Sequence, residues 1–140
     1  MTIDEGIEYD RAVTQAELYE YVCKEGFDVS DFSDRFLNSE FCGRSMDANY
    51  SRHQLEFPEL LASYVFEEVV PKKAEENFVP EEVAWWVGYM YRQLSLKYHI
   101  TSRNIVRQLP FEKIARRYNG LHIVDDDIAL ELLRNAIFRG

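Results

Sequence analysis

The residues with the chemistry for metal binding or catalysis are few in this chain, and they do not form a recognised motif. Asp125, Asp126 and Asp127 are the densest group of possible metal ligands. Consecutive side chains at the start of a helix point in different directions, however, and the alternating oxygen ligands and glycine of an EF-hand are absent. We therefore interpret the three carboxylates as the negative first turn of a helix, where the helix dipole stabilises them.

The histidines and cysteines also lack the spacing of a known site. His53, His99 and His122 are far apart in the sequence, and none has a partner at zinc-ligand spacing. Cys23 and Cys42 show no nucleophile motif, and in a reducing compartment we expect them to be small core or boundary residues. We predict no catalytic residue, no metal and no cofactor. An enzyme that uses His122 or Asp125 is kept only as the last alternative.

The length and composition of the chain predict a single folded domain. Its 140 residues are 46% hydrophobic and 14% aromatic, which is typical of a globular protein and not of a disordered one. No apolar run approaches the roughly 20 residues of a membrane-spanning helix. The acidic N-terminus lacks the basic and apolar segments of a signal peptide. We therefore expect a cytoplasmic protein that makes no membrane contact.

The net charge of −9 is distributed unevenly along the chain. Residues 1–80 hold 18 acidic and 7 basic residues, whereas residues 81–140 hold 7 acidic and 9 basic ones. Within residues 92–117, seven basic residues stand against one acidic residue. Two interpretations remain open: the two parts neutralise each other within the fold, or each part faces a partner of opposite charge.

A helix over residues 80–98 is the strongest structural prediction. Pro80, Glu81 and Glu82 are suited to the first turn of a helix. Residues 85–92 then place four aromatic residues, a glycine and an arginine in about two helical turns. A helix that is apolar on nearly all sides is usually buried, so we expect this one at the centre of the core.

The remaining pattern predicts further helices and almost no strand, so the expected fold is all-α, a single compact domain of six or seven helices. We interpret residues 1–13 as a polar leader and residues 14–140 as the domain, which is acidic to about residue 80. The first helix is expected to begin at a capping box formed by Thr14 and Glu17. The other expected helices span 31–42, 58–69, 102–109, 111–118 and 125 onward, with polar connections at 44–57 and 71–80 and an extended piece at 121–124. In the last helix, the residues expected to face the core are Ile128, Leu132, Leu133, Ala136 and Ile137.

The basic segment suggests a DNA-binding regulator as an alternative function. The helix at 80–98, a short turn and a helix starting at Ser102 resemble a helix-turn-helix in outline. The residue types suited to base edges and phosphates are Arg103, Asn104, Arg107, Arg116 and Arg117. The usual glycine in the turn is missing, and a net charge of −9 opposes binding to phosphates.

Several stretches resemble a poorly characterised family of small acidic, helical bacterial proteins. The family carries a Trp-x-Gly-Tyr-x-Tyr-Arg helix, a helix start of the type Thr/Ser-Ser-Lys-Glu-Ile and a Tyr-x-x-x-His-Thr-x-Asp ending. The matching stretches in this chain are 83–93, 101–105 and 118–129, with similar pieces at 37–42 and 47–50, so the resemblance spans about residues 36–133. The chain departs from the family at Arg103-Asn104, where the family has Lys-Glu, and at Ile123-Val124, where the family has Thr-x. The resemblance implies an antitoxin-like protein of a toxin–antitoxin or mobile-element locus.

Charge and resemblance together predict a non-enzymatic binding protein that neutralises or regulates a protein partner encoded nearby. Acidic N-terminal helices are expected to cover a basic surface of that partner, with aromatic residues as anchors. A related alternative is an inhibitor that imitates a nucleic acid and blocks a nucleic-acid-binding protein. The expected contact residues are Glu17, Tyr19, Glu20, Glu25, Phe27, Asp28, Asp31, Phe32 and Asp34.

Overall fold

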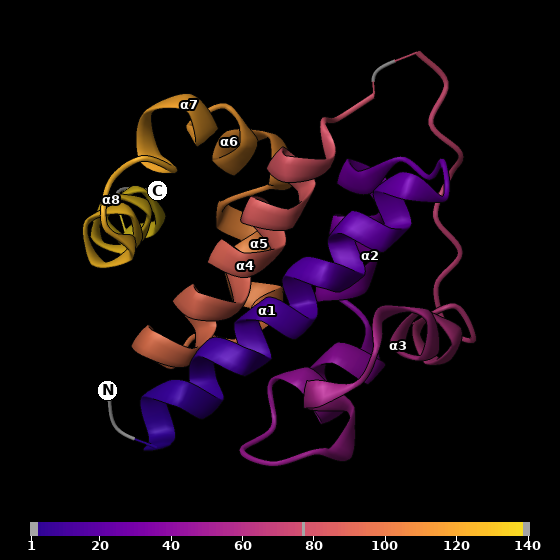
Figure 1. Ribbon diagram of the computed structural model, residues 1–140, viewed down its shortest axis with the longest axis horizontal. Coiled ribbons are helices and arrows are strands. Elements are labelled where there is room, and N and C mark those ends of the chain that lie inside the picture. Colours follow the sequence, from indigo (N-terminus) through magenta and orange to yellow (C-terminus); the bar gives the residue numbers. More distant parts are fainter. Residues whose placement is uncertain (1–2, 77, 139–140) are drawn as a thin grey trace.

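Two long antiparallel helices, α1 (Ile3–Lys24) and α4 (Glu81–Tyr98), form the axis of the fold (Figure 1). The computed structural model describes residues 3–76 and 78–138, and in these residues the chain is an all-α domain without strands. The other helices are α2 (Val29–Leu37), a π-helix η1 (Cys42–Met46), a 3₁₀ helix η2 (Arg52–Leu55), α3 (Pro58–Val65), α5 (Ser102–Gln108), α6 (Phe111–Ala115), α7 (Tyr118–Leu121) and α8 (Asp126–Phe138).

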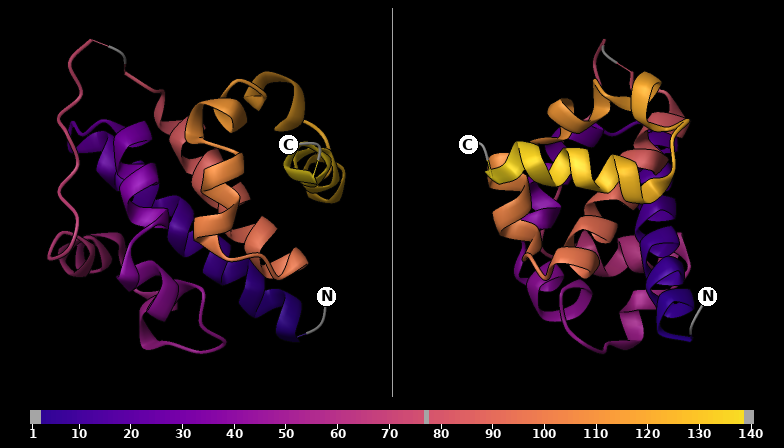
Figure 2. Two further views of the ribbon diagram at one scale, coloured as in Figure 1. Left: turned by 180° about the vertical axis from the view of Figure 1, so that it is seen from behind. Right: turned by 90° about the vertical axis from the view of Figure 1, so that its left-hand side faces the viewer.

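The shorter helices lie on both sides of the α1–α4 pair. On one side, α3 contacts α1, and the segment after α3 runs back past α2 before α4 begins (Figure 1). On the other side, α6, α7 and α8 contact α4. Helix α8 is seen end-on in Figure 1 and along its length in the right-hand view of Figure 2, so it crosses the pair at a steep angle. Among the described residues, no helix has the length and apolar character needed to cross a membrane.

The close approach of α1 and α4 depends on Gly88. A Cβ atom at this position would lie 2.7 Å from Cγ of Tyr19, so only glycine fits without movement of the buried ring. Gln15, one turn before Tyr19, donates a hydrogen bond from Nε2 to the Gly88 carbonyl oxygen (3.1 Å). The glycine of the aromatic helix is therefore explained by helix packing.

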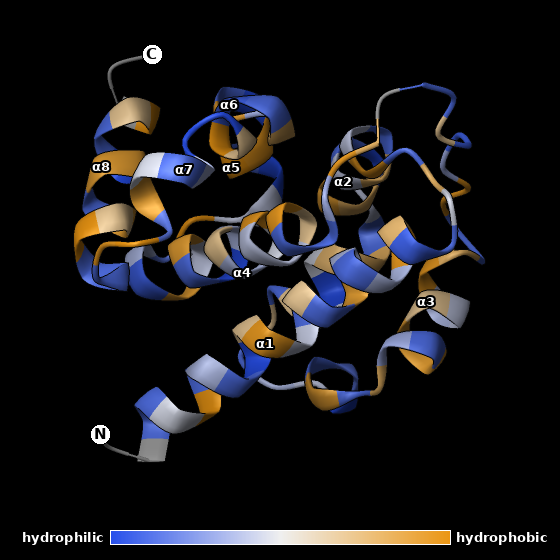
Figure 3. Cartoon of the chain, turned by 45° about the horizontal axis from the view of Figure 1, so that its top comes forward, coloured by the Kyte–Doolittle hydropathy of each residue, from blue (hydrophilic) through white to orange (hydrophobic). Residues whose placement is uncertain are grey.

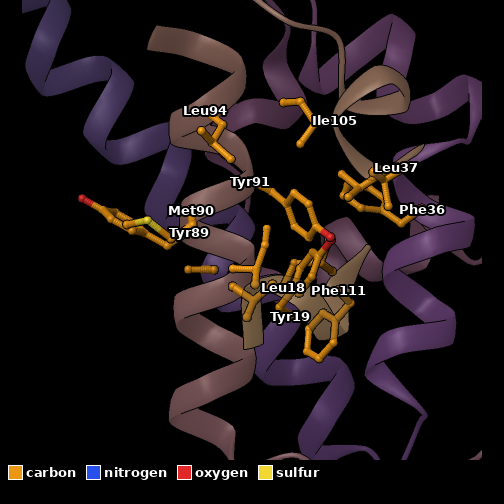
Figure 4. Packing of buried hydrophobic residues seen from close by; sticks show 14 of the residues in the cluster. Leu18, Tyr19, Phe36, Leu37, Tyr89, Met90, Tyr91, Leu94, Ile105 and Phe111 are labelled. Carbon is orange, nitrogen blue, oxygen red and sulfur yellow. The ribbon is translucent and has the colours of Figure 1, made fainter. Parts of the chain in front are cut away.

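An aromatic cluster fills the space between α1, α2, α4 and α6 (Figure 4). Tyr19 packs edge-on against Phe32, with ring centroids 5.5 Å apart, and lies stacked over Phe111 at 6.5 Å. Its hydroxyl group is hydrogen-bonded to Ser33 of α2 (2.8 Å), and the Tyr91 hydroxyl donates to the Leu109 carbonyl oxygen (2.7 Å). Hydrophilic and hydrophobic positions alternate along the helices (Figure 3), as expected when one face of each is buried.

The structure confirms the central helix and extends the first one. Helix α4 begins after Pro80, and Thr101 caps α5 by accepting a hydrogen bond from the Asn104 amide. Helix α1 already begins at Ile3, so the described part of the predicted polar leader forms its first turns. Thr14 does not cap a helix, because its hydroxyl donates to the Asp10 carbonyl oxygen inside α1.

The segment between α2 and α3 is more ordered than predicted. Helix α2 ends at Leu37, and the π-helix Cys42–Met46 and the 3₁₀ helix Arg52–Leu55 occupy half of the predicted polar connection. The Asp47 amide donates to the Cys42 carbonyl oxygen (2.9 Å), which is the wide turn of a π-helix. Such a turn has no simple periodicity in the sequence. Helix α3 ends at Val65, four residues earlier than expected.

The C-terminal region also differs from the prediction. Helix α7 (Tyr118–Leu121) lies where a helix end and an extended piece were expected. Two of the residues assigned to the core in the last helix, Ile128 and Leu132, are 51% and 44% exposed. Leu133 and Ile137 are buried as predicted, and Ala129 and Leu130 complete the buried face of α8. The helix is rotated about its axis relative to the predicted orientation, because side chains of similar apolarity occur on adjacent faces.

Replacement of Gly88 by alanine should destabilise the fold by about 1–3 kcal/mol, because the added methyl group collides with the Tyr19 ring. Urea unfolding followed by circular dichroism measures this change. The matched control is Gly43→Ala, where an added Cβ meets no atom within 4 Å. Equal stability of the two variants would contradict the packing assignment.

Candidate partner-binding surface

Arg92, which follows the aromatic residues within α4, is buried in the protein. Arg92 has no exposed surface, and its guanidinium donates to Oε1 of Gln15 (2.9 Å), Oδ1 of Asp47 (2.7 Å) and Oγ of Ser102 (3.0 Å). A buried charge is tolerated only when it is paired and hydrogen-bonded. These partners come from α1, from the residue after η1 and from α5.

Asp47 completes this cluster from the segment that was expected to be a plain polar connection. Its Oδ2 accepts a hydrogen bond from the Ser102 amide (3.0 Å), and Oδ1 accepts a second from the Ser102 hydroxyl. The carboxylate therefore both neutralises Arg92 and holds the start of α5. Because Arg92 and Asp47 form an ion pair with each other, we assign the cluster a structural role.

The two cysteines are free, and neither has the environment of an activated nucleophile. Burial raises the pKa of the Cys42 thiol to about 11, an effect that the adjacent Arg92 only partly offsets. Burial also raises the pKa of Cys23, and the nearby carboxylates of Glu81 and Glu20 raise it further. Nucleophilic cysteines require the opposite shift of pKa.

Two of the three consecutive aspartates form part of the contact between α8 and α4. Asp126 accepts a hydrogen bond from the Tyr89 hydroxyl (2.6 Å), and Asp127 pairs with Lys97 (2.9 Å). Burial and the bond to Asp126 raise the pKa of Tyr89 well above its usual value. Asp126 and Asp127 lie in the first turn of α8, as predicted. No three metal-binding side chains converge within the described residues.

The basic segment is partly used within the fold. Besides Arg92 and Lys97, Arg103 is also engaged, because it donates to the Asn38 carbonyl oxygen (2.7 Å). The remaining residues of the DNA-binding prediction, Asn104, Arg107, Arg116 and Arg117, have exposed side chains. Helix α5 contacts α2, α4 and η1, so it lies against the body of the protein and presents only one face to solvent.

Two of the predicted aromatic anchors are wrong. Tyr19 and Phe32 are completely buried, so they stabilise the core and are unavailable to a partner. Their positions on α1 and α2 place them on the faces that meet, which the charge pattern does not reveal. Phe27 is half-buried and packs against Phe66, with ring centroids 5.4 Å apart.

The predicted acidic contacts divide into two groups. Asp28 caps α2 by accepting a hydrogen bond from the Asp31 amide, and Asp31 pairs with Arg35 (3.0 Å) and accepts from the Lys72 amide (2.8 Å). Both carboxylates therefore stabilise the fold through these contacts. The others reach solvent: the partly buried Glu17 and Glu20 on α1, and the exposed Glu25 just after α1 and Asp34 on α2.

A cleft next to this acidic surface was not predicted. It has a volume of about 400 Å³ and lies where α1, α4 and α7 meet. Four of its lining residues carry rings and two carry carboxylates: Trp85, Trp86, Tyr118, His122, Glu20 and Glu82. The helical spacings of Glu82 to Trp85 and of Tyr118 to His122 are visible in the sequence. Their common location is not, because it depends on the packing of α7 against α4.

The rings in the cleft are fixed by contacts with one another. Trp86 meets Tyr118 edge-to-face, with ring centroids 5.6 Å apart, and Tyr118 stacks on His122 at 4.0 Å. Trp85 is half-buried and stacks on Tyr89 at 5.1 Å. The cleft is therefore a preformed aromatic surface with acidic groups at its margin.

Comparison with family models, with curated proteins and with solved structures found no match to this chain. The resemblance to antitoxin-like proteins therefore stays a prediction based on the residues of the aromatic helix and the stretches after it. In this structure, several of those residues have internal roles: Gly88 in helix packing, Tyr91 in a core hydrogen bond and Arg92 in the buried cluster.

Truncation of Asp47 to alanine should cost about 3–5 kcal/mol of stability, because it leaves the Arg92 charge buried without its counter-ion. Chemical unfolding measures the loss. Glu40→Ala is the control, since the Glu40–Arg44 pair is exposed and its removal should leave stability nearly unchanged. A similar small effect for both variants would show that Arg92 finds other partners.

Proposed function

We propose that this chain is a non-enzymatic, antitoxin-like binding protein that neutralises or regulates a protein partner. Its contact surface is formed by the solvent-facing carboxylates of α1 and α2 together with the start of α4. The partner contributes a basic surface, which the acidic helices cover. A nucleic-acid-binding protein would be one such partner, and the chain would then imitate the nucleic acid.

The observation that carries this proposal is the convergence of carboxylates from distant parts of the chain. Lys24 of α1 lies 3.3 Å from Glu20 and 4.0 Å from Glu81, at the start of α4. Glu82 lines the same cleft as Glu20. One lysine therefore pairs with two carboxylates, and a third carboxylate lines the cleft beside Glu20. The surface keeps an excess of negative charge that long-range steering of a basic partner requires.

Reversal of four carboxylates that reach solvent should slow association with the partner at least tenfold at low salt, because complementary charge acts mainly on the association rate. The variant combines Glu17→Lys, Glu20→Lys, Glu25→Lys and Asp34→Lys. The partner is first captured from a host lysate on the tagged chain and identified by mass spectrometry, and its association rate is then measured by surface plasmon resonance.

The control variant carries the same change of net charge on other parts of the surface, at Glu59, Glu67, Glu75 and Glu76, which are exposed. It should associate clearly faster than the first variant, since only the first alters the proposed contact. Equal association rates for the two variants would show that only net charge matters. The acidic surface of α1 and α2 would then not be the contact surface. Failure to capture any salt-sensitive partner would count against the function itself.

A DNA-binding regulator is the second candidate, supported by exposed basic groups at the end of α5 and after it. Among the described residues, none forms an ion pair with Arg107, Lys113, Arg116 or Arg117. This candidate predicts that duplex DNA binds at about 50 mM salt and is released as salt rises. Joint replacement of Arg107, Arg116 and Arg117 by alanine should abolish the binding in a fluorescence-anisotropy titration. Absence of binding to the unaltered chain would exclude it.

A further inference from the structure

We propose that the aromatic cleft between α1, α4 and α7 receives an arginine side chain of the protein partner. This inference rests on the proposed function, and it names the group that the acidic surface recognises. The cleft combines the two features that bind a guanidinium group: aromatic faces and carboxylates.

The aromatic part of the cleft suits a flat cation. Tryptophan gives the strongest attraction among aromatic rings for a cation placed over its face, and both tryptophans of the chain, Trp85 and Trp86, line the cleft. Tyr118 and His122 close another side as a stacked pair. A guanidinium group can stack on such rings, whereas a compact ammonium group is more strongly hydrated.

The charged part of the cleft suits the same group. Glu20 and Glu82 approach from different helices, and carboxylates are the natural partners of the forked guanidinium donors. No lysine or arginine lines the cleft itself. A cation that enters therefore meets two negative groups and the exposed parts of Trp85, Tyr118 and His122, whereas Trp86, which is 7% exposed, forms the floor. The volume of about 400 Å³ accommodates one long side chain.

A lysine beside the cleft already shows where a positive group is attracted. Lys24 reaches Glu20 from the adjacent turn of α1, but half of its side chain is exposed, and exposed pairs of this kind contribute little to stability. An arginine from a partner can therefore replace Lys24 at Glu20 at small cost. Removal of the Lys24 charge should strengthen the binding of the arginine.

Tryptophan fluorescence tests this proposal directly, because both tryptophans lie in the cleft and no others are present. The probe is argininamide, titrated into the full chain at constant ionic strength. We expect a saturable change of fluorescence with a millimolar Kd. Citrullinamide, which has nearly the same shape but no charge, should give no saturable change. Equal responses to both compounds would overturn the role of the cation.

Variants locate the binding within the cleft. The pair Glu20→Gln and Glu82→Gln should raise the Kd for argininamide at least threefold, whereas Lys24→Met should lower it. The matched control is the pair Glu75→Gln and Glu76→Gln, which removes the same charge from the exposed connection before α4. An equal increase in both pairs would show that the effect comes from net charge.

Other probes distinguish an arginine of a partner from a free small cation. They also separate a failure of this inference from a failure of the proposed function. A short arginine-containing peptide should bind at least as tightly as argininamide. Saturable binding of tetramethylammonium without binding of the peptide would assign the cleft to a free small cation and overturn the proposal. Tighter binding of lysinamide than of argininamide would overturn the choice of arginine. If no cation binds but the charge-reversal variant still loses its partner, the proposed function stands and this inference falls.

Discussion

The fold depends on one buried positive charge. The guanidinium of Arg92 is fully enclosed, so it must be satisfied by protein groups, and these come from three other parts of the chain. Gln15 connects it to α1, Asp47 to the segment after the π-helix, and Ser102 to α5. Any arrangement that separates these elements leaves the Arg92 charge unpaired in the interior. An unpaired buried charge strongly destabilises the folded state. The cluster therefore selects one packing of helices that hydrophobic contact alone would leave less defined.

One face of α4 packs in the core, and another face supports the proposed binding surface. The face with Gly88 and Arg92 is used for packing against α1 and for the buried cluster, so its residues are unavailable to ligands. The other face carries Trp85 and Tyr89 toward α7 and α8, where carboxylates of α1 and α4 reach solvent. Rigid aromatic side chains beside an excess of negative charge are features of a binding surface. The same helix thus organises the core and supports the proposed contact.

The parts of the fold that were predicted correctly are those whose signals are local. Helix α4 has a proline start and a long apolar pattern, and Thr101 precedes a helix as a capping residue. The errors occur where local signals compete. Thr14 and Glu17 resemble a capping box, yet the helix continues through them because α1 packs along its whole length against α4 and α3. Ile128 and Leu132 are apolar but exposed, since neighbouring α8 residues take the buried face.

The sequence by itself determined the helical class, the central aromatic helix, and the separation of acidic and basic segments, because helix periodicity and charge are local properties of the chain. Only the tertiary structure decided which residues are accessible. It buried Tyr19 and Phe32, gave Asp47 a structural partner, and brought Glu20 to the rings of Trp85 and Trp86. The physical reason is that accessibility and charge pairing depend on contacts between residues that are distant in sequence, and these contacts exist only after the helices have packed.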